Sequence, residues 1–370
     1  MGYSSKYNFD NALFLTAMIL LGIGVVMVYS SSSVLASRYH ENSAFFLVKQ
    51  GISAFLGLVL MLVTMRINYH IYKNPAFIYT AILITGILLV LVFFPYISKE
   101  INGSRRWLNF GYFTFQPSEI AKLTIIIYLA YFLDKKSNKK KEGSNLFIGP
   151  AMIVGFLLFL IIKEPDFSTC VIILFSVIAI YFIAGLRFIH IFSISLLFIP
   201  VLYFLINSCG YRRERWLEYI DALLNPLNAS YHVQHSIIAM GNGGFWGMGF
   251  GNSAQKYLFL PLPHSDFIFS IIGEELGFIG TLTIIILFGI LLWRGLLISK
   301  RSRDLFGSLL AGGITILIGV EIILNIGVTS ALLPVTGIVL PFISCGGTSL
   351  IMTMILIGLL LNISLRERRI

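Results

Sequence analysis

Long apolar segments recur along the whole 370-residue chain, and short polar stretches separate them. A run of about 18 or more apolar residues is long enough to cross a bilayer as an α-helix. The chain is therefore predicted to be an all-α integral membrane protein, with residues 1–370 forming one polytopic domain. About ten membrane helices are expected, near residues 11–33, 44–65, 76–95, 117–134, 146–163, 168–185, 187–206, 267–293, 305–328 and 343–364.

The composition supports this class of protein. Hydrophobic residues make up 57% of the chain and charged residues only 12%, which excludes an ordinary soluble domain. The formal net charge is +10. In a membrane protein, basic loops record topology and contact anionic lipid headgroups, so no nucleic-acid partner is expected. The three cysteines show no metal-ligand spacing, and their odd number argues against a disulfide framework.

The distribution of lysine and arginine among the predicted loops indicates the orientation, because cytoplasmic loops are enriched in these residues. Both termini are predicted to be cytoplasmic. The segment 207–266 is then a long extracellular loop between the seventh and eighth helices, where functional residues are expected to gather. The basic residues on the predicted cytoplasmic side are Lys6, Arg66, Lys73, Lys135, Lys136, Lys139, Lys140, Lys141, Arg187, Arg294, Lys300, Arg301, Arg303, Arg366, Arg368 and Arg369.

Charged residues interrupt the apolar part of the fourth predicted helix, in F-Q-P-S-E-I-A-K (115–122). Pro117 suits the first turn of a helix. Glu119 and Lys122 stand three residues apart on one helical face and are within reach of each other. Charges inside a membrane usually pair and face a cavity. The spacing leaves open whether these two residues form a structural ion pair or belong to a functional site.

Two shorter outer segments also depart from the apolar pattern. In K-E-P-D-F-S-T (163–169), Asp166, Ser168 or Thr169 is predicted to cap the next helix. In L-L-P-V-T-G-I-V-L-P-F-I-S-C-G-G-T-S (332–349), two prolines and several glycines break a helix. Broken backbone at membrane depth is tolerated only where it is buried in protein or lines a cavity. The second segment is therefore expected in one of these two settings.

The long outer loop carries most of the remaining polar chemistry. Arg213 and Arg215 lie in Y-R-R-E-R-W (211–216), and clustered arginines suit either a substrate phosphate or the phosphates of surrounding lipids. Six glycines fall between residues 241 and 251, so this backbone is able to approach a ligand or to pack as a re-entrant turn. His264 and Asp266 follow, two residues apart. Together these groups suggest an outward-open cavity for a polar or phosphorylated substrate, and leave transporter, flippase and enzyme all open.

Five sequence motifs follow one another along the chain. They are N-G-S-R-R-W, F-Q-P-S-E-I-A-K, E-P-D-F-S-T, G-F-G-N-S-A-Q-K with H-S-D-F-I-F-S-I-I-G-E-E-L-G, and L-P-V-T-G-I-V-L-P-F-I-S-C-G-G-T-S. In this order they resemble the motifs of the SEDS family (shape, elongation, division and sporulation), whose members include FtsW, RodA and SpoVE. The resemblance spans nearly the whole chain. The compact stretch Gly249–Ser253 before Gln255-Lys256 resembles the FtsW and SpoVE branch more than RodA.

Several positions depart from the family pattern. Leu262 stands where many relatives have a glutamate, and glutamines are replaced by His232, His235, Glu164 and Glu321. These changes alter polar groups around the expected site but leave Asp266 in place. They are expected to affect the fine positioning of the substrate, the branch assignment and the level of activity more than the class of reaction.

The resemblance implies a peptidoglycan glycosyltransferase that polymerises lipid II with inversion at the anomeric carbon, for cell division or sporulation. Asp266 falls on the family's essential aspartate and is the expected base, and it is also the only metal ligand that the sequence suggests for an expected Mg²⁺ or Mn²⁺. Glu119 and Lys122 are expected to share its cavity. The substrate-binding candidates are Arg106, Trp107, Arg213, Arg215, Lys256, His264 and Ser344.

The resemblance also implies a place in the cell and a set of partners. The protein is expected to be a multi-pass protein of the bacterial cytoplasmic membrane, with its active site facing outward. The expected partners are lipid II, the nascent lipid-linked glycan, a class B penicillin-binding protein and other divisome or elongasome proteins. A lipid II flippase would need polar groups that continue toward the cytoplasm, whereas the candidates gather outside. A catalytically weak scaffold is the other alternative, and the presence of Asp266, Glu119 and Lys122 argues against it.

Overall fold

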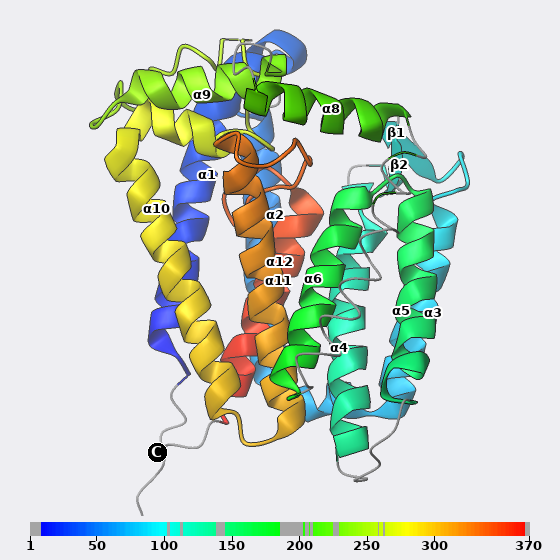
Figure 1. Cartoon of the computed structure of the whole chain (residues 1–370). Helices are drawn as coiled ribbons and strands as arrows, with labels where there is room; N and C mark the ends of the chain where they lie inside the picture. The colour runs from blue at the N-terminus through cyan, green and yellow to red at the C-terminus, as the bar shows by residue number, and fades with distance from the viewer. Residues whose placement is uncertain are drawn as a thin grey trace, which may run out of the picture.

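The computed structural model describes residues 9–101, 104–111, 114–137, 145–185, 203, 207, 210–224, 229–257, 259–261 and 263–366. Nine of the ten predicted helices are present in this part of the chain and run side by side as a bundle (Figure 1). The seventh predicted helix, 187–206, lies outside the described residues. The nine helices are α1 (Asn11–His40), α2 (Phe45–Arg66), α3 (Pro75–Leu91), α4 (Pro117–Ser137), α5 (Asn145–Lys163), α6 (Phe167–Ile183), α10 (Ile268–Arg301), α11 (Leu305–Thr329) and α12 (Gly347–Ser364).

Short polar side chains set the starts of several helices. Asp10 caps α1 by accepting a hydrogen bond from the backbone N–H of Leu13 at 2.9 Å. Asn74 caps α3, where Pro75 occupies the first turn. Asp166 caps α6 by accepting from the backbone N–H of Thr169, which confirms one of the predicted caps.

Five of the described helices are long and apolar enough to cross a membrane by length and composition, namely α1, α2, α10, α11 and α12. The helices α3 and α6 and the part of α5 from residue 149 are apolar but shorter. Most of α11 and α12 is buried within the bundle, whereas only 28% of the apolar 18-residue stretch of α2, and 28% of that of α10, is buried. A bilayer would therefore contact α2 and α10 more than α11 and α12.

The helices pack closely where glycine removes the side chain. The α2 and α12 helices meet at Gly358, where an added Cβ would overlap the Thr64 hydroxyl and the Met61 carbonyl. Gly295 of α10 and Thr315 of α11 meet in the same way. Small residues at such contacts allow membrane helices to approach each other.

One end of the bundle carries additional elements that cross the helix ends (Figure 1). These elements are α8 (Gly210–Leu224), α9 (Tyr231–Gly243) and an antiparallel sheet of β1 (Ser98–Ile101), β2 (Ser104–Asn109) and β3 (Thr114–Phe115). The opposite end carries the 3₁₀ helix η1 (Tyr69–Lys73) and the connection between α10 and α11. The sheet corrects the all-α prediction. Its strands are too short for a clear alternation of apolar and polar residues, although the Asn-Gly pair between β1 and β2 is a typical hairpin signal.

Four helix ends differ from the predicted bounds by four residues or more, and one of them is the end of α3, at Leu91 instead of 95. The α1 and α10 helices end at His40 and Arg301, beyond the predicted residues 33 and 293. The prediction used the apolar run alone, whereas the backbone hydrogen bonds of a helix continue through the polar residues that follow it. The α12 helix begins at Gly347 instead of 343, since the side chain of Ser344 bonds the backbone of a turn. Within α10, Gly277 has φ of 67°, outside the helical region, so the helix is broken there.

Candidate active site

Asp266 lies in the turn segment that leads into α10. The α10 helix begins at the end of the bundle that carries α8 and α9 (Figure 1). Its own carbonyl accepts a hydrogen bond from the Asn325 side chain of α11 at 3.0 Å. The Ser344 hydroxyl donates to the Ser265 carbonyl at 2.6 Å, and the Cys345 N–H donates to the His264 carbonyl at 2.8 Å. The backbone that carries Asp266 is thus fixed by α11 and by the broken segment before α12.

Two arginines supply the positive charge around the Asp266 carboxylate. Burial raises the pKa of this carboxyl group, while a hydrogen bond from Ser265 and the charges of Arg215 and Arg106 oppose the rise. The carboxylate lies beside Gly337, where an added Cβ would be 3.6 Å from Oδ2. The site therefore combines one carboxylate with two guanidinium groups from separate outer elements, β2 and α8.

Arg106 is held by the turn between α5 and α6. Its guanidinium donates to the Pro165 carbonyl at 2.6 Å and lies 3.8 Å from the Asp166 carboxylate. Asp166 is 2% exposed and also accepts from Gln116 and Ser118, each at 3.1 Å. Asp166 therefore orients Arg106 as well as capping α6, a second role that the helix-cap pattern did not indicate.

The broken segment 332–349 forms a neighbouring wall of the site. Ser168 donates to the Thr336 carbonyl at 2.6 Å, and the Arg215 guanidinium donates to the Val335 carbonyl at 3.0 Å. These bonds connect the segment to α6 and α8. The part of the segment from Leu340 to Ser344 is buried in protein, whereas Leu332 is exposed and Gly337 lies beside Asp266. The segment thus lies in the two settings that its prolines and glycines predicted.

Glu164 is a buried carboxyl group beside this network. It is 1% exposed, and neither of its oxygens has a hydrogen-bond partner among the described residues. Burial, with a smaller contribution from Asp166, raises the pKa of Glu164 to about 9, while Arg106 opposes the rise. The group is therefore neutral at pH 7, so it resembles the glutamine that the family pattern has at this position.

Lys122 and Glu119 form an ion pair within the bundle. The Lys122 ammonium lies 2.9 Å from Glu119 and also contacts Glu321 of α11. All three side chains are buried, at 5%, 7% and 3% exposure. The residues thus join α4 to α11. The groups that act on the charge of Asp266 are Arg106 and Arg215, while Lys122 is engaged by two glutamates.

Lys256 belongs to a separate buried cluster. Its ammonium lies 3.0 Å from Glu275 and 2.5 Å from the Gly251 carbonyl, and the residue is 3% exposed. Ser30 of α1 contacts the same Glu275 carboxylate at 2.7 Å. The Glu275 carboxylate compensates the charge of the lysine, and these contacts connect the glycine-rich loop to α10 and α1.

The glycine-rich loop packs against the broken part of α10. Met248 and Gly249 donate their backbone N–H groups to the carbonyls of Glu274 and Glu275 at 2.9 and 3.1 Å. An added Cβ at Gly277 would overlap the backbone of residues 245–247. The Glu274 carboxylate accepts hydrogen bonds from Ser253, Ala254 and Gln255. Close backbone packing, one of the two interpretations of this loop, is present.

The other predicted site residues occupy different settings. His264 is 7% exposed and its ring lies 4.4 Å from that of Phe46, and burial lowers its pKa to about 4. Ser344 holds the loop of Asp266, as described above. Trp107 follows Arg106 in β2, so it projects to the opposite face of the strand. Arg213 is exposed on α8.

The described residues contain no group of three or more His, Cys, Asp or Glu side chains placed to hold a metal ion. The charges around the Asp266 carboxylate come from two arginines. Mg²⁺ and Mn²⁺ prefer several oxygen ligands, and two cations nearby oppose their binding. The described groups around Asp266 therefore do not form a binding site for a divalent cation. The cation expected from the resemblance stays a prediction.

Sequence reasoning did not assign a role in the site to Asp166, Glu321 or Asn325. Asp166 had a sufficient explanation as a helix cap. Glu321 and Asn325 stand four residues apart in an apolar helix, which places both on one face. Polar residues at that spacing in a membrane helix indicate a face that points into the bundle, and this pattern could have identified both residues.

Known proteins resemble this chain over almost its full length. A family model described as Cell cycle protein, covering FtsW, RodA and SpoVE, matches residues 10–369. The chain is 41% identical to a probable peptidoglycan glycosyltransferase FtsW of Geobacter metallireducens, covering 97% of this chain and 96% of that one. It is 39% identical to the stage V sporulation protein E of Bacillus subtilis, covering 99% of both.

Solved structures share the fold. The rod shape determining protein RodA of Thermus thermophilus superimposes with a TM-score of 0.73 at 25% identity, covering 100% of this chain and 99% of that one. A chain from a peptidoglycan synthase complex gives a TM-score of 0.77 at 27% identity, covering 96% and 97%. With the five motifs and the full-length match, these similarities lead to one conclusion: the chain belongs to the FtsW/RodA/SpoVE family of cell cycle proteins.

Proposed function

We propose that this chain is a peptidoglycan glycosyltransferase that polymerises lipid II on the outer face of the bacterial cytoplasmic membrane. The observation that carries the proposal is the Asp266 carboxyl group, which lies on backbone fixed by Asn325 and Ser344 and whose charge Arg106 and Arg215 stabilise. The relatives named as probable peptidoglycan glycosyltransferases, at 38–41% identity over nearly the whole chain, support the same reaction.

The reaction requires a base and a means of stabilising a leaving group. Asp266 removes the proton from the acceptor hydroxyl of the incoming sugar, whose oxygen then forms a bond to the anomeric carbon of the lipid-linked glycan. The bond from that carbon to the diphosphate breaks, and its electron pair leaves on the diphosphate oxygen. Attack on the face opposite the diphosphate inverts the anomeric carbon.

The surroundings of Asp266 suit both requirements. A carboxylate whose pKa is raised by burial is a stronger base than an exposed one, provided that it stays ionised. Arg106 and Arg215 favour the ionised form, and they also carry the charge that a diphosphate leaving group would meet. Their hydrogen bonds to the Pro165 and Val335 carbonyls fix both guanidinium groups before substrate binds.

The orientation and the partner belong to the same proposal. Lysines and arginines gather at the end of the bundle opposite Asp266, which supports a cytoplasmic location for that end. They include Arg66, Lys73, Lys300, Arg301 and Arg303. The active site then faces outward. The similarity to a chain of a synthase complex for polymerization and crosslinking supports a class B penicillin-binding protein as partner.

The test is the polymerisation of labelled lipid II by the purified protein with its partner and a divalent cation, read as glycan bands on a gel. Asp266→Asn is expected to lower the rate about 10²–10⁴-fold, since the amide keeps the shape but cannot accept the proton. Asp221→Asn, an exposed aspartate on α8, is the matched control and is expected to keep the wild-type rate.

Two outcomes would contradict the proposal at different points. If folded Asp266→Asn made polymer at the wild-type rate, Asp266 would not be the base. If the wild-type protein made no polymer with an active partner and intact substrate, the glycosyltransferase function itself would be wrong. Repeating the wild-type reaction over a chelator titration tests the predicted Mg²⁺ or Mn²⁺.

A further inference from the structure

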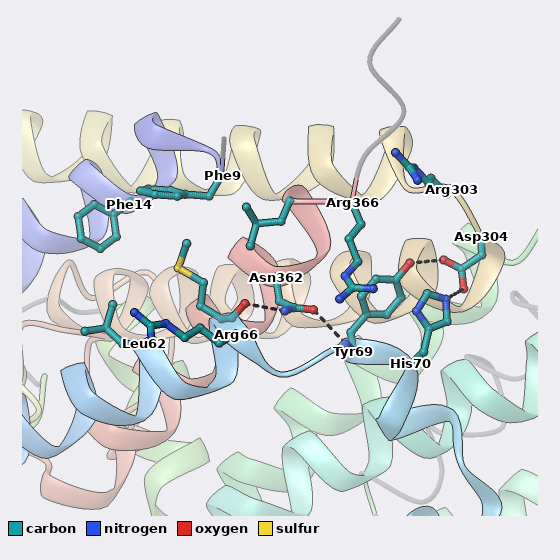
Figure 2. A pocket seen from close by; sticks show the side chains of 12 residues that line it. Phe9, Phe14, Leu62, Arg66, Tyr69, His70, Arg303, Asp304, Asn362 and Arg366 are labelled. Carbon is teal, nitrogen blue, oxygen red and sulfur yellow. Dashed lines mark hydrogen bonds and ion pairs between the residues drawn. The ribbon is translucent and has the colours of Figure 1, made fainter. Parts of the chain in front are cut away.

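A pocket of about 780 Å³ lies at the end of the bundle opposite Asp266 (Figure 2). It is formed where α1 begins, α2 and α12 end, and α10 connects to α11. Its volume falls within the roughly 300–1,000 Å³ that is typical of ligand pockets. The lining residues are Phe9, Phe14, Leu62, Met65, Arg66, Tyr69, His70, Arg303, Asp304, Asn362, Leu365 and Arg366.

The floor of this pocket is built from buried polar bonds. The Asn362 side chain is 1% exposed, donates to the Met65 carbonyl at 2.6 Å and accepts from the Tyr69 N–H at 2.9 Å. These bonds join the end of α2 and the start of η1 to α12. The pocket therefore has a defined shape that does not depend on a ligand.

The pocket is divided into an apolar part and a charged part. Figure 2 shows Phe9 and Phe14 at one end and His70 and Asp304 at the other, with Arg366 reaching toward Tyr69 between them. The apolar part continues onto the membrane-facing surface of α2, because Leu62 is 42% exposed. An elongated molecule with a polar head and an apolar chain would match both parts.

The charged part carries an excess of positive charge. Arg303 and Arg366 lie in this part with one carboxylate, Asp304, and a third arginine of the pocket, Arg66, lies beside Leu62 (Figure 2). The Tyr69 hydroxyl donates to that carboxylate at 2.5 Å and His70 lies 3.5 Å from it, so Asp304 already has partners. In the described part of the chain neither Arg66 nor Arg366 has a carboxylate partner.

We propose that this pocket binds an anionic glycerophospholipid, with Arg66 and Arg366 on the phosphate and the start of an acyl chain against Phe14 and Leu62. Guanidinium groups bind phosphate with paired hydrogen bonds. Basic pockets between membrane helices at the cytoplasmic surface suit anionic headgroups. The position of Arg66 at the last residue of a 22-residue apolar helix places it at headgroup depth. The assignment to the inner leaflet rests on the orientation proposed above.

The experiment measures lipid binding to the purified full chain by native mass spectrometry and by the shift of its melting temperature. The lipids are phosphatidylglycerol, phosphatidylcholine with the same chains, and short-chain phosphatidylglycerol, and inorganic phosphate alone is a further arm. Phosphatidylglycerol is expected to bind and to raise the melting temperature, with weaker effects from the other two lipids and none from phosphate.

The double variant Arg66→Gln/Arg366→Gln is expected to bind phosphatidylglycerol about 25-fold more weakly, at about fivefold for each arginine near a membrane surface. The matched control is Arg301→Gln, which removes a cation at the same end of the bundle but outside the pocket. The variant Arg66→Lys/Arg366→Lys keeps the charge and is expected to lose less of the affinity for phosphatidylglycerol. Because binding is read without lipid II, a failed polymerase assay does not affect this result.

Three results would overturn the proposal. One is equal phosphatidylglycerol binding by the wild type and by a folded Arg66→Gln/Arg366→Gln variant. Another is a loss of phosphatidylglycerol binding in Arg301→Gln as large as that in the double variant, which would indicate a general effect of surface charge. The third is full protection by inorganic phosphate alone, which would mean a free anion site. If the double variant does not fold, Leu62→Gln, which alters only the apolar part, is expected to weaken long-chain binding more than short-chain binding.

Discussion

At the scale of single residues, the site owes its chemistry to how each charge is partnered. The charges of two arginines stabilise the ionised form of Asp266, and Lys122 forms ion pairs with two glutamates. Glu164 has no hydrogen-bond partner among the described residues. A buried carboxyl group without a partner avoids the cost of its charge by keeping its proton. A neutral glutamate at residue 164 carries no charge, like the glutamine of the family pattern, so the two side chains differ little in their electrostatic effect.

The neutral state of Glu164 predicts a pH dependence of stability. The folded pKa of about 9 lies above the ordinary value of 4.5, so between these values the folded state holds a proton that the unfolded state has lost. Stability therefore falls as the pH rises through this window. Glu164→Gln removes the effect and is expected to stabilise the protein by up to about 3 kcal/mol at pH 7.

Melting temperatures at pH 5.5, 7 and 8.5 in one detergent would check this expectation. The difference between Glu164→Gln and the wild type should grow with pH. Glu218→Gln, an exposed glutamate on α8, should show no such growth. A difference that stays constant across the three pH values would mean that residue 164 is ionised in the folded protein.

At the scale of elements, Glu274 is the central acceptor of the glycine-rich loop. It accepts from the backbone N–H groups of Ala254 and Gln255, both at 3.2 Å, and from the Ser253 hydroxyl. Glu274→Ala would leave these donors without a partner, at a cost of about 1–3 kcal/mol for each buried group. Hydrogen exchange in residues 244–256 is expected to become faster, and Glu274→Gln should give an intermediate result.

The internal control for this exchange measurement is α11, whose buried backbone should keep its protection in both variants. Unchanged protection of residues 244–256 in Glu274→Ala would show that the loop is held mainly by the backbone bonds to residues 274 and 275.

The elements also show what the sequence could predict. The long apolar runs predicted nine helices of the described chain to within a few residues at most ends, because bilayer-length apolar segments have few alternatives to a helix. The three short strands have no such signal. Pairings such as Arg106 with Asp166 and Lys122 with Glu321 join residues 60 and 199 positions apart, so periodicity within one helix could not indicate them.

At the scale of the whole molecule, the two ends of the bundle differ. One end carries α8, α9, the sheet and Asp266, and the other carries the arginine-lined pocket. The proposed orientation predicts opposite labelling of two engineered cysteines in a variant with Cys170, Cys209 and Cys345 changed to Ser. Tyr96→Cys, at a residue 99% exposed near the sheet, should react with an impermeant maleimide in intact cells.

Arg301→Cys, at the end of α10, should react only after the cells are made permeable. Labelling of Arg301→Cys but not Tyr96→Cys in intact cells would reverse the orientation. Labelling of both would indicate that the two positions are on one side and that the number of spans between them is wrong.

The break in α10 at Gly277 has a mechanical consequence. It separates the nine residues 268–276, which follow Asp266 and are bonded to the glycine-rich loop, from the long rod of residues 278–301. Helices tilt to match bilayers of different thickness. If the rod tilts, the backbone at residue 277 can bend. The short outer part of α10 and the preceding Asp266 carboxylate then keep their position relative to Arg106 and Arg215. Turnover in nanodiscs is therefore expected to change little between lipids of shorter and longer chains, and a steep dependence would show that α10 moves as one piece.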